Sequence, residues 1–422
     1  MALINRALKV RIYPTQEQEV LINKTLGCSR FLYNQMLNDR IQIYDRLKNN
    51  KKELYTYKYK TEKEYKAEFE WLKEVDAKSL QQANIDLSNA YSNFFKSLKG
   101  ERKGTKVGFP KFKKKGHNDS YRTVQAIKVN FNDNLLIIPK LKLKFRHKGI
   151  KNWYLTSKPK SVTISKVPSG KYYASILFEG EQDFNGSAEI INNSKILGLD
   201  MSMDKFYVDQ YGNSPNYQKL YRINEKKLAK FQKELSRKTR GSKNWEKARV
   251  KVAKLHEKIA NQRKDFIDKL SLKLVTENDV IIIENLSLKG MSQALNLGKS
   301  VMDIGYSSFV NKLMYKSLWN DKIVIKADKW FASSKTCSCC GYIKKNLLLQ
   351  ERNWKCPNCG TEHNRDQNAG QNLVQFGLKY LGQEMPKVKL VEKISSDLNK
   401  SLDQEISVKQ EYRKIDENQL SI

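Results

Sequence analysis

The amino-acid sequence predicts a multidomain α+β protein: a helical module, a small antiparallel β-barrel, and an α/β domain that contains a four-cysteine zinc ribbon. Three observations support this prediction. Residues 15–100 have helical periodicity, residues 121–180 alternate between apolar and polar side chains, and from Lys195 onward short apolar strands alternate with helices. A chain of 422 residues has room for several units of about 100–200 residues each.

The first segment begins with an alternating strand at residues 7–13. Thr15 and Gln18 follow with the spacing of a capping box, so a helix is expected to start here and to end near Gly27. Further helical runs continue to about residue 100. An ordinary small bundle with a solvated basic face is the alternative to a specialised helical module.

Period-two alternation then predicts a set of strands and one tight turn. The strands are expected at residues 135–138, 141–145, 161–167 and 171–178, and the turn at Pro168-Ser169-Gly170. Together they predict a small antiparallel barrel, which the strand at residues 7–13 would complete.

The last part of the chain has an α/β pattern. Residues 196–199 and 280–283 are apolar and are predicted to be buried strands, ending in Asp200 and Glu284. Two long charged helices, a further helix and a third strand complete the pattern. They are expected at residues 223–275 with a break at 240–242, at 302–320 and at 322–326, followed by a final helix at 366–381.

The charge indicates a polyanionic partner. Lys and Arg number 79 against 45 Asp and Glu, a net charge of +34, which would destabilise a compact chain by self-repulsion. Nucleic acid is the first candidate and an anionic membrane surface the second. A basic loop at residues 106–116 alternates Lys with Phe, which suits phosphate contact and base stacking, although a solvated charge run is the alternative. Without a spanning segment or signal peptide, a cytoplasmic, nucleoid-associated protein is expected.

Cysteine spacing predicts a structural zinc site. Two C-x₂-C pairs are separated by 15 residues, within the range of Cys₄ zinc sites. The predicted ligands are Cys337, Cys340, Cys356 and Cys359. Cys339 is a fifth thiol with less suitable spacing, and Cys28 is expected in the core.

Three acids, Asp200, Glu284 and Asp366, are candidate ligands for magnesium. Asp200 and Glu284 each end an apolar strand, and Asp366 begins a helix directly after the cysteines. Grouped carboxylates repel one another unless a divalent cation neutralises them, and two Mg²⁺ ions can clamp a phosphodiester during displacement. Helix caps and turns are the alternative for each acid alone. No nucleophilic triad, P-loop or dinucleotide fingerprint is visible.

The motifs of the whole chain resemble one known family. They include RIYPTQEQEVLINKTLGCSRFLYN, SLQQANIDLSNAYSNFFKSLKG, VGFPKFKKK, SVTISKVPSGKYYASI and SSKTCSCCGY…WKCPNCGTEHNRDQNAGQN. Residues 1 to about 380 resemble TnpB, the RNA-guided nuclease encoded by insertion sequences and related to type V CRISPR effectors.

This resemblance implies a division into domains. The family has a wedge barrel, a helical recognition domain, an RNase H-like (RuvC) nuclease domain and a zinc ribbon. They correspond here to residues 1–13 with 121–190, 14–120, 191–334 with 363–382, and 335–362, followed by a poorly ordered tail at 383–422.

The resemblance also implies site residues. The catalytic acids fall on Asp200, Glu284 and Asp366, and the zinc ligands on the four cysteines already named. The residues that recognise the DNA motif beside the target correspond here to Gln81, with Lys78 and Thr123 as weaker candidates. The remaining candidate nucleic-acid contacts are Lys111, Lys113, Lys114 and Arg122. The sequence departs from the family pattern at Met201-Ser202, at Asn364 and at Gly370, where a common alanine is replaced.

The function implied is an RNA-guided, Mg²⁺-dependent DNA endonuclease. It would bind a structured guide RNA made from the end of its element, recognise a short duplex motif and cut double-stranded target DNA as a monomer in the ribonucleoprotein. An RNA-guided DNA-binding repressor with an inactive nuclease site is the second hypothesis. A structural RNA-binding protein is the third, and the motifs argue against a cut-and-paste transposase.

Overall fold

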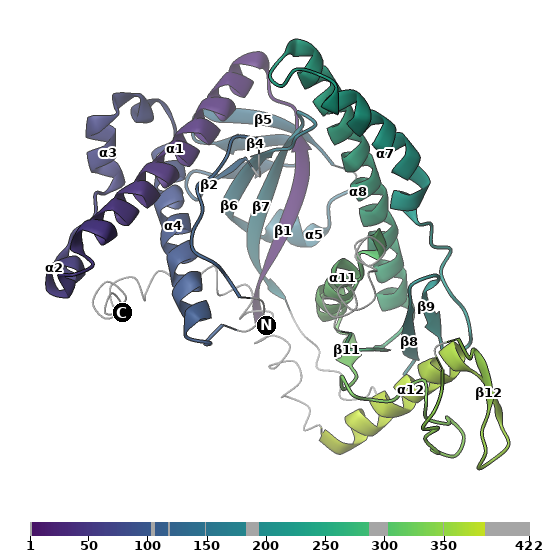
Figure 1. Cartoon of the computed structure of the whole chain (residues 1–422). Helices are drawn as coiled ribbons and strands as arrows, with labels where there is room; N and C mark the ends of the chain where they lie inside the picture. Colours follow the sequence, from purple (N-terminus) through teal and green to yellow (C-terminus); the bar gives the residue numbers. More distant parts are fainter. Residues whose placement is uncertain are drawn as a thin grey trace. The chain divides into compact units, whose positions relative to one another are not determined.

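The computed structural model describes residues 2–102, 106–116, 119–147, 149–182, 194–286, 303–348 and 350–384 (Figure 1). These residues fall into two compact units, 2–182 and 194–384. The predicted C-terminal tail lies outside the described residues from position 385 onward.

The first unit contains the predicted helices. They are α1 (Gln16–Leu47), α2 (Lys51–Thr56), α3 (Glu62–Glu68), the 3₁₀ turn η1 (Glu70–Glu74) and α4 (Ala77–Leu98). The capping box is confirmed: the Thr15 side chain accepts a hydrogen bond from the Gln18 backbone N–H at 3.4 Å, and the Gln18 side chain accepts one from the Thr15 N–H at 3.0 Å.

The predicted helix end near Gly27 is wrong, because α1 continues for 20 residues beyond it, to Leu47. A glycine inside a helix costs about 1 kcal/mol relative to alanine. Leu26, Leu32 and Leu37 of the same helix are all buried, and each is worth roughly 1.5–3 kcal/mol. Core packing of α1 therefore outweighs the local preference of glycine.

Seven strands of the first unit form one antiparallel sheet in the order β2-β6-β7-β1-β5-β4-β3. They are β1 (Ala2–Ile12), β2 (Ser120–Thr123), β3 (Lys128–Asn130), β4 (Leu135–Ile138), β5 (Leu141–Arg146), β6 (Lys158–Lys166) and β7 (Tyr172–Gln182), with the short helix α5 (Asn152–Thr156) between β5 and β6. The predicted turn is confirmed, since the Gly170 N–H donates to the Val167 carbonyl at 2.9 Å and Gly170 has a φ of 90°.

The N-terminal strand joins this sheet at its centre, where β1 pairs with β7 along its whole length and with β5 at its end. The outer strands β2 and β3 are only four and three residues long. They do not pair with each other within the described residues, so the sheet is open and the predicted closure into a barrel is not observed. Such short edge strands offer few backbone groups for a closing pair.

The second unit has the predicted α/β pattern around a four-stranded sheet of order β11-β10-β8-β9. Its strands are β8 (Ile196–Ser202), β9 (Phe206–Asp209), β10 (Val280–Ile283) and β11 (Ile323–Lys326), and a two-stranded hairpin adds β12 (Asn353–Lys355) and β13 (Glu362–Asn364). Its helices are α7 (Leu220–Ser236), α8 (Lys243–Glu277), α11 (Tyr306–Trp319) and α12 (Arg365–Glu384).

The middle strand β10 shows how this unit is layered. Ile281 and Ile283 pack in one core with α8 and α11, whereas Val280 and Ile282 pack in another with Leu373 of α12. Alternate side chains of a strand point to opposite faces, so the sheet lies between α8 and α11 on one face and α12 on the other (Figure 1). Among the described residues, no helix is long and apolar enough to cross a membrane.

Candidate functional site

Asp200 and Glu284 lie beside each other on neighbouring parallel strands. Leu199 of β8 is in register with Ile283 of β10, so the next residues along the two strands, Asp200 and Glu284, are adjacent. Leu199 and Ile283 both belong to the core under α8 and α11. Because side chains alternate, Asp200 and Glu284 face the other side of the sheet, where α12 packs. Asp200 lies inside β8 and not at its end, since the strand continues to Ser202.

Asp366 joins these two acids from the first turn of α12. Asp200 is only 8% exposed and hydrogen-bonded with Glu284. Burial, together with the negative charges of Glu284 and Asp366, raises the pKa of Asp200 well above the usual aspartate range. The structure therefore brings the three predicted acids close enough for the charges of Glu284 and Asp366 to act on Asp200.

Arg352 holds the carboxylate of Asp366 in this structure. Its Nη1 lies 3.0 Å from Asp366 Oδ1, and the Asp366 side chain is 17% exposed. Within the described residues, the four cysteines form a compact group of potential metal ligands, and the three acids do not form such a group in this structure. The acids are thus neighbours, and one of them is paired with an arginine from the cysteine-rich segment.

Two glycines allow α12 to approach the strand that carries Asp200. A Cβ at Gly198 would lie 2.2 Å from the Gly370 carbonyl oxygen, and a Cβ at Gly370 would lie 2.7 Å from the Gln210 backbone nitrogen. Gly370 replaces an alanine common in the family pattern, and the contact with the backbone after β9 explains this departure. The departure at Met201-Ser202 also has a structural role. The Ser202 hydroxyl accepts hydrogen bonds from the backbone N–H groups of Asp204 and Lys205, in the turn between β8 and β9.

Gly198→Ala is expected to push α12 off β8 and to lower the stability of the second unit by about 1–3 kcal/mol, as overpacking usually does. The closest contact of a Cβ at this position, 2.2 Å, would be with the Gly370 carbonyl oxygen, a backbone atom that cannot move to another rotamer. Thermal unfolding of the purified protein measures this. Gly382→Ala near the end of the same helix is the control, since a Cβ there meets nothing within 4 Å. An unfolding temperature for Gly198→Ala equal to that of Gly382→Ala would contradict this account of the packing.

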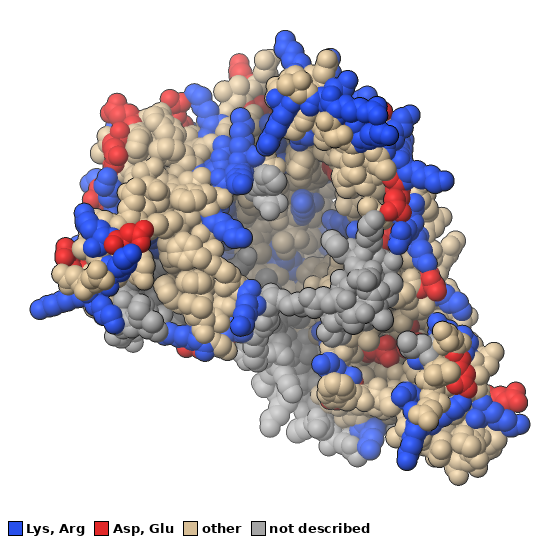
Figure 2. Space-filling view, in the orientation of Figure 1, with Lys and Arg blue, Asp and Glu red and all other residues tan. Residues whose placement is uncertain are grey.

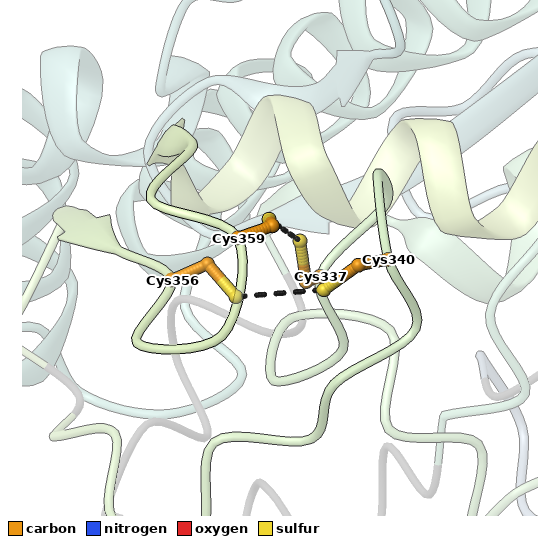
Figure 3. Close-up of side chains that lie close together, drawn as sticks. All are labelled: Cys337, Cys340, Cys356 and Cys359. Carbon is orange, nitrogen blue, oxygen red and sulfur yellow. Dashed lines mark hydrogen bonds between the residues drawn. The ribbon is translucent and has the colours of Figure 1, made fainter.

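The four predicted cysteines form one cluster (Figure 3). The sulfurs of Cys337, Cys340, Cys356 and Cys359 all lie within 4.8 Å of one another. Cys337 and Cys359 are 3.6 Å apart, as are Cys340 and Cys356. Cys339 is exposed and outside the group. The four thiols therefore form one group that is able to hold a metal ion. Its first pair is Cys337 and Cys340, as the spacing predicted.

Neighbouring groups favour the thiolate form at part of this cluster. Hydrogen bonds with Thr361 lower the pKa of Cys359 to about 6, and a hydrogen bond from Asn358 lowers the pKa of Cys340. Burial instead raises the pKa of Cys337 to about 12. The buried ring of His363 lies with its Nε2 3.0 Å from the Cys337 sulfur, where it can donate to a thiolate. A thiolate is the form that binds metal.

Several side chains of this site are absent from the sequence predictions. Ser333 donates to Glu284 Oε1 at 2.8 Å, and Asn368 and Asn372 are each 1% exposed against the segment that carries Ser333 and Cys337. One signal was visible: Asn368, Gln371, Asn372 and Gln375 recur at helical spacing. That amide face on an otherwise amphipathic helix indicates a polar contact with another part of the chain.

The predicted nucleic-acid contacts in the first unit have different environments. Lys111, Lys113 and Lys114 are exposed on the basic loop, as is Gln81 on α4, which accepts a hydrogen bond from Lys78. Lys113 and Arg122 line a pocket with Arg30 between α1, α4 and β2. Thr123 is 0% exposed, so its hydroxyl is not accessible to a ligand in this state.

The hairpin of α7 and α8 is a further basic surface. Residues 219–254 carry 14 Lys and Arg but three Glu and no Asp, and Figure 2 shows Lys and Arg side chains over these helices. Such a density of positive charge favours a polyanion. The sequence indicates two charged helices here without identifying them as a contact surface.

Three family models match separate parts of the chain. The model described as "Helix-turn-helix domain" matches residues 1–51, the one described as "Probable transposase" matches 181–295, and the one described as "Cas12f1-like, TNB domain" matches 306–373. The third match contains the four-cysteine cluster and Asp366.

Relatives and a solved structure agree with these matches. A protein of Streptomyces pristinaespiralis named as an RNA-guided DNA endonuclease is 30% identical over 90% of each chain. The Escherichia coli K12 protein InsQ, which has the same name, is 30% identical over 88% of this chain and 92% of its own. The cryo-EM structure of a Cas12f1–sgRNA–target DNA complex has a similar fold, with a TM-score of 0.50 at 16% identity, covering 88% of this chain and 99% of that one.

Proposed function

Because the chain belongs to the TnpB family of RNA-guided DNA endonucleases, we propose that it cleaves DNA at sites chosen by a bound guide RNA. Its net charge of +34 supports a nucleic-acid partner. A guide RNA from the end of the element and double-stranded target DNA are the partners, and the working form is a monomer in the ribonucleoprotein. The division into wedge, recognition, RuvC and zinc-ribbon domains, with the boundaries given above, is part of the same proposal.

The observation that supports catalysis best is the convergence of Asp200, Glu284 and Asp366 on one face of the second sheet. Grouped carboxylates fit Mg²⁺, which prefers oxygen ligands. The raised pKa of Asp200 fits as well, because burial and the negative charges of Glu284 and Asp366 disfavour its ionised form, and a bound cation would offset this. These three acids would hold two Mg²⁺ ions.

When bound, Mg²⁺ supplies an activated water and stabilises the charge that develops on the phosphate. The acids act as ligands and not as nucleophiles. Asp200 is fixed within the paired part of β8, and Asp366 is fixed by α12 against the same strand. Arg352 must release Asp366 for that carboxylate to act as a metal ligand. The products would carry 5′-phosphate and 3′-hydroxyl ends.

A structural Zn²⁺ ion would occupy the four-cysteine cluster. The donor set of Cys337, Cys340, Cys356 and Cys359 fits a closed tetrahedral site. Gly341 and Gly360 follow the two pairs with positive φ values of 78° and 72°, and these turns direct both thiols of each pair inward. Closed sites stabilise a fold and do not bind substrate.

Nucleic-acid contacts are proposed on the first unit. The exposed Gln81 is suited to reading an adenine in the duplex beside the target, and Lys78, which donates a hydrogen bond to it, lies beside it on α4. Thr123 is 0% exposed and is not proposed as a contact in this state. Lys111, Lys113, Lys114 and Arg122 would contact phosphates.

The experiment that tests the function begins with the RNA that copurifies with the full-length protein. Sequencing it identifies the guide, whose targeting end is then replaced to match a plasmid with a randomised flank. The expected result is cleavage of the matching plasmid alone, in Mg²⁺ and not in EDTA. Target binding without cleavage in Mg²⁺ would instead favour the repressor hypothesis, and the absence of guide-dependent binding would refute both.

Mg²⁺ is expected to raise the unfolding temperature less at a pH near the ordinary aspartate range than at a pH well above it. The raised pKa means that the folded, metal-free chain keeps a proton on Asp200 above the ordinary aspartate range. Its free energy of unfolding therefore falls as the pH rises through that raised value, and at low pH the proton competes with the cation. Thermal unfolding of the wild type and of Asp200→Asn at both pH values measures this. An equal Mg²⁺ effect in the two proteins would contradict Asp200 as a ligand.

A further inference from the structure

Ser333 connects Glu284 to the segment before the cysteines. Directly after β11, the backbone N–H of Ala327 donates a hydrogen bond to the Ile283 carbonyl at 2.8 Å. Six residues later, Ser333 contacts Glu284, the residue after Ile283. Ser333 is 4% exposed, and its hydroxyl donates to Glu284 Oε1 at 2.8 Å. Hydrogen bonds to ionised acceptors are about twice as strong as neutral ones, and this one is shielded from water.

Asn372 of α12 fixes the backbone of Ser333. Its amide Nδ2 donates to the Ser333 carbonyl at 2.7 Å and to the Thr336 carbonyl at 2.6 Å. Asn372 is 1% exposed, so water cannot replace these bonds without opening the packing. The position of the Ser333 hydroxyl is thereby tied to α12.

The same face of α12 holds the first cysteine pair. Asn368 donates to the Thr336 carbonyl at 2.7 Å and accepts from the Ser338 N–H at 3.0 Å. Gln371 accepts from the Ser338 hydroxyl, and Gln375 donates to the Ser338 carbonyl, both at 2.7 Å. Ser338 directly follows Cys337. One helix therefore carries Asp366, anchors the cysteine-rich segment and supports the partner of Glu284.

We propose that Ser333 is a positioning residue for the Glu284 carboxylate, and that Asn372 holds Ser333 in place. This inference rests on the proposed function, in which Glu284 is a Mg²⁺ ligand. Glutamate has three flexible side-chain dihedrals, and Glu284 follows the last paired residue of β10. A fixed donor at Oε1 selects one orientation before metal arrives, which strengthens metal binding without adding a ligand.

The test compares Ser333→Ala and Ser333→Thr with the matched control Ser334→Ala, whose side chain makes no hydrogen bond in the described part of the chain. Mn²⁺ binding is measured by EPR on the full protein–guide RNA complex, with Asp200→Ala as the background. The Mg²⁺ midpoint of single-turnover cleavage, the unfolding temperature and the zinc content are measured in parallel. Ser333→Ala should weaken Mn²⁺ binding and raise the Mg²⁺ midpoint by about 10–100-fold, with unfolding temperature and zinc content unchanged. Ser333→Thr should recover both, and Ser334→Ala should match the wild type.

Wild-type metal affinity in Ser333→Ala would overturn the proposal, as would a loss of zinc or unfolding temperature that parallels the loss of cleavage. Asn372→Ala tests the second part of the proposal, that Asn372 holds Ser333 in place. It should raise the Mg²⁺ midpoint, and adding it to Ser333→Ala should cause no further increase, whereas additive increases would refute the link. If the wild-type complex binds Mn²⁺ but does not cleave, the proposed function fails while the Mn²⁺ affinities still decide the role of Ser333.

Discussion

Asp200→Ala is expected to lower guided DNA cleavage on the order of 10³-fold or more, while guide RNA and target DNA remain bound. Asp200 is the most buried of the three acids and lies on the paired part of β8. Its carboxyl group lies beside Glu284 and within the field of Asp366. Removing it leaves the remaining acids too few to hold two cations, so the chemical step is lost and the binding surfaces of the first unit are untouched.

The control for this variant is Asp204→Asn, in the turn that follows the same strand. Asp204 is 79% exposed and pairs with Lys219 at 2.7 Å. A surface pair of this kind contributes little to stability, so cleavage should remain at the wild-type rate. Single-turnover cleavage and gel-shift binding are measured on both complexes. Cleavage that survives in Asp200→Ala would refute the proposed catalytic site, and a loss of DNA binding would show that the substitution acts on assembly.

The strand pattern of the sequence pointed to Asp200 and Glu284 because each follows an apolar run, although Asp200 lies inside β8 and not at its end. Periodicity cannot show which residues of two strands lie side by side, and the strand register supplies this. Only the pairing of Leu199 with Ile283 makes the two acids neighbours on the α12 face. The cysteine spacing likewise predicted the cluster, and it favoured Cys340 over Cys339 correctly because two residues between thiols allow both to converge.

Contacts made through the backbone of a distant segment could not be predicted in this way. Asn372 holds the carbonyls of Ser333 and Thr336, and any residue type presents the same carbonyl. The pairing of Arg352 with Asp366 depends on how the β12–β13 hairpin folds back onto α12. The helix through Gly27 and the open sheet are also tertiary outcomes, since packing overrides local preference in one and strand length decides closure in the other.

Cys337→Ser is expected to prevent zinc binding and to abolish guided cleavage, although Cys337 lies far in sequence from Asp200 and Glu284, the proposed Mg²⁺ ligands on the sheet. The free energy of structural zinc binding is about 10–16 kcal/mol in small zinc domains. The cysteine-rich segment has only two short strands of its own, β12 and β13, so its folding would depend on that free energy. Without the ion, the segment between the cysteine pairs has a core of four side chains: Cys337, Leu347, Trp354 and Cys356. That core is too small to keep the segment folded.

The loss would reach catalysis through α12. Ser338, next to Cys337, is hydrogen-bonded to Asn368, two residues after Asp366 along the helix, and the backbone N–H of Arg365 donates to the Arg352 carbonyl at 2.7 Å. Unfolding the segment therefore frees the first turn of α12. Zinc content and cleavage rate are measured together, with Cys339→Ser as the matched control because its thiol is exposed and outside the cluster. The control should keep about one zinc ion per chain and the wild-type rate. If Cys337→Ser lost its zinc yet still cut DNA at that rate, α12 would hold Asp366 without help from the metal, and the coupling of the two sites would be wrong.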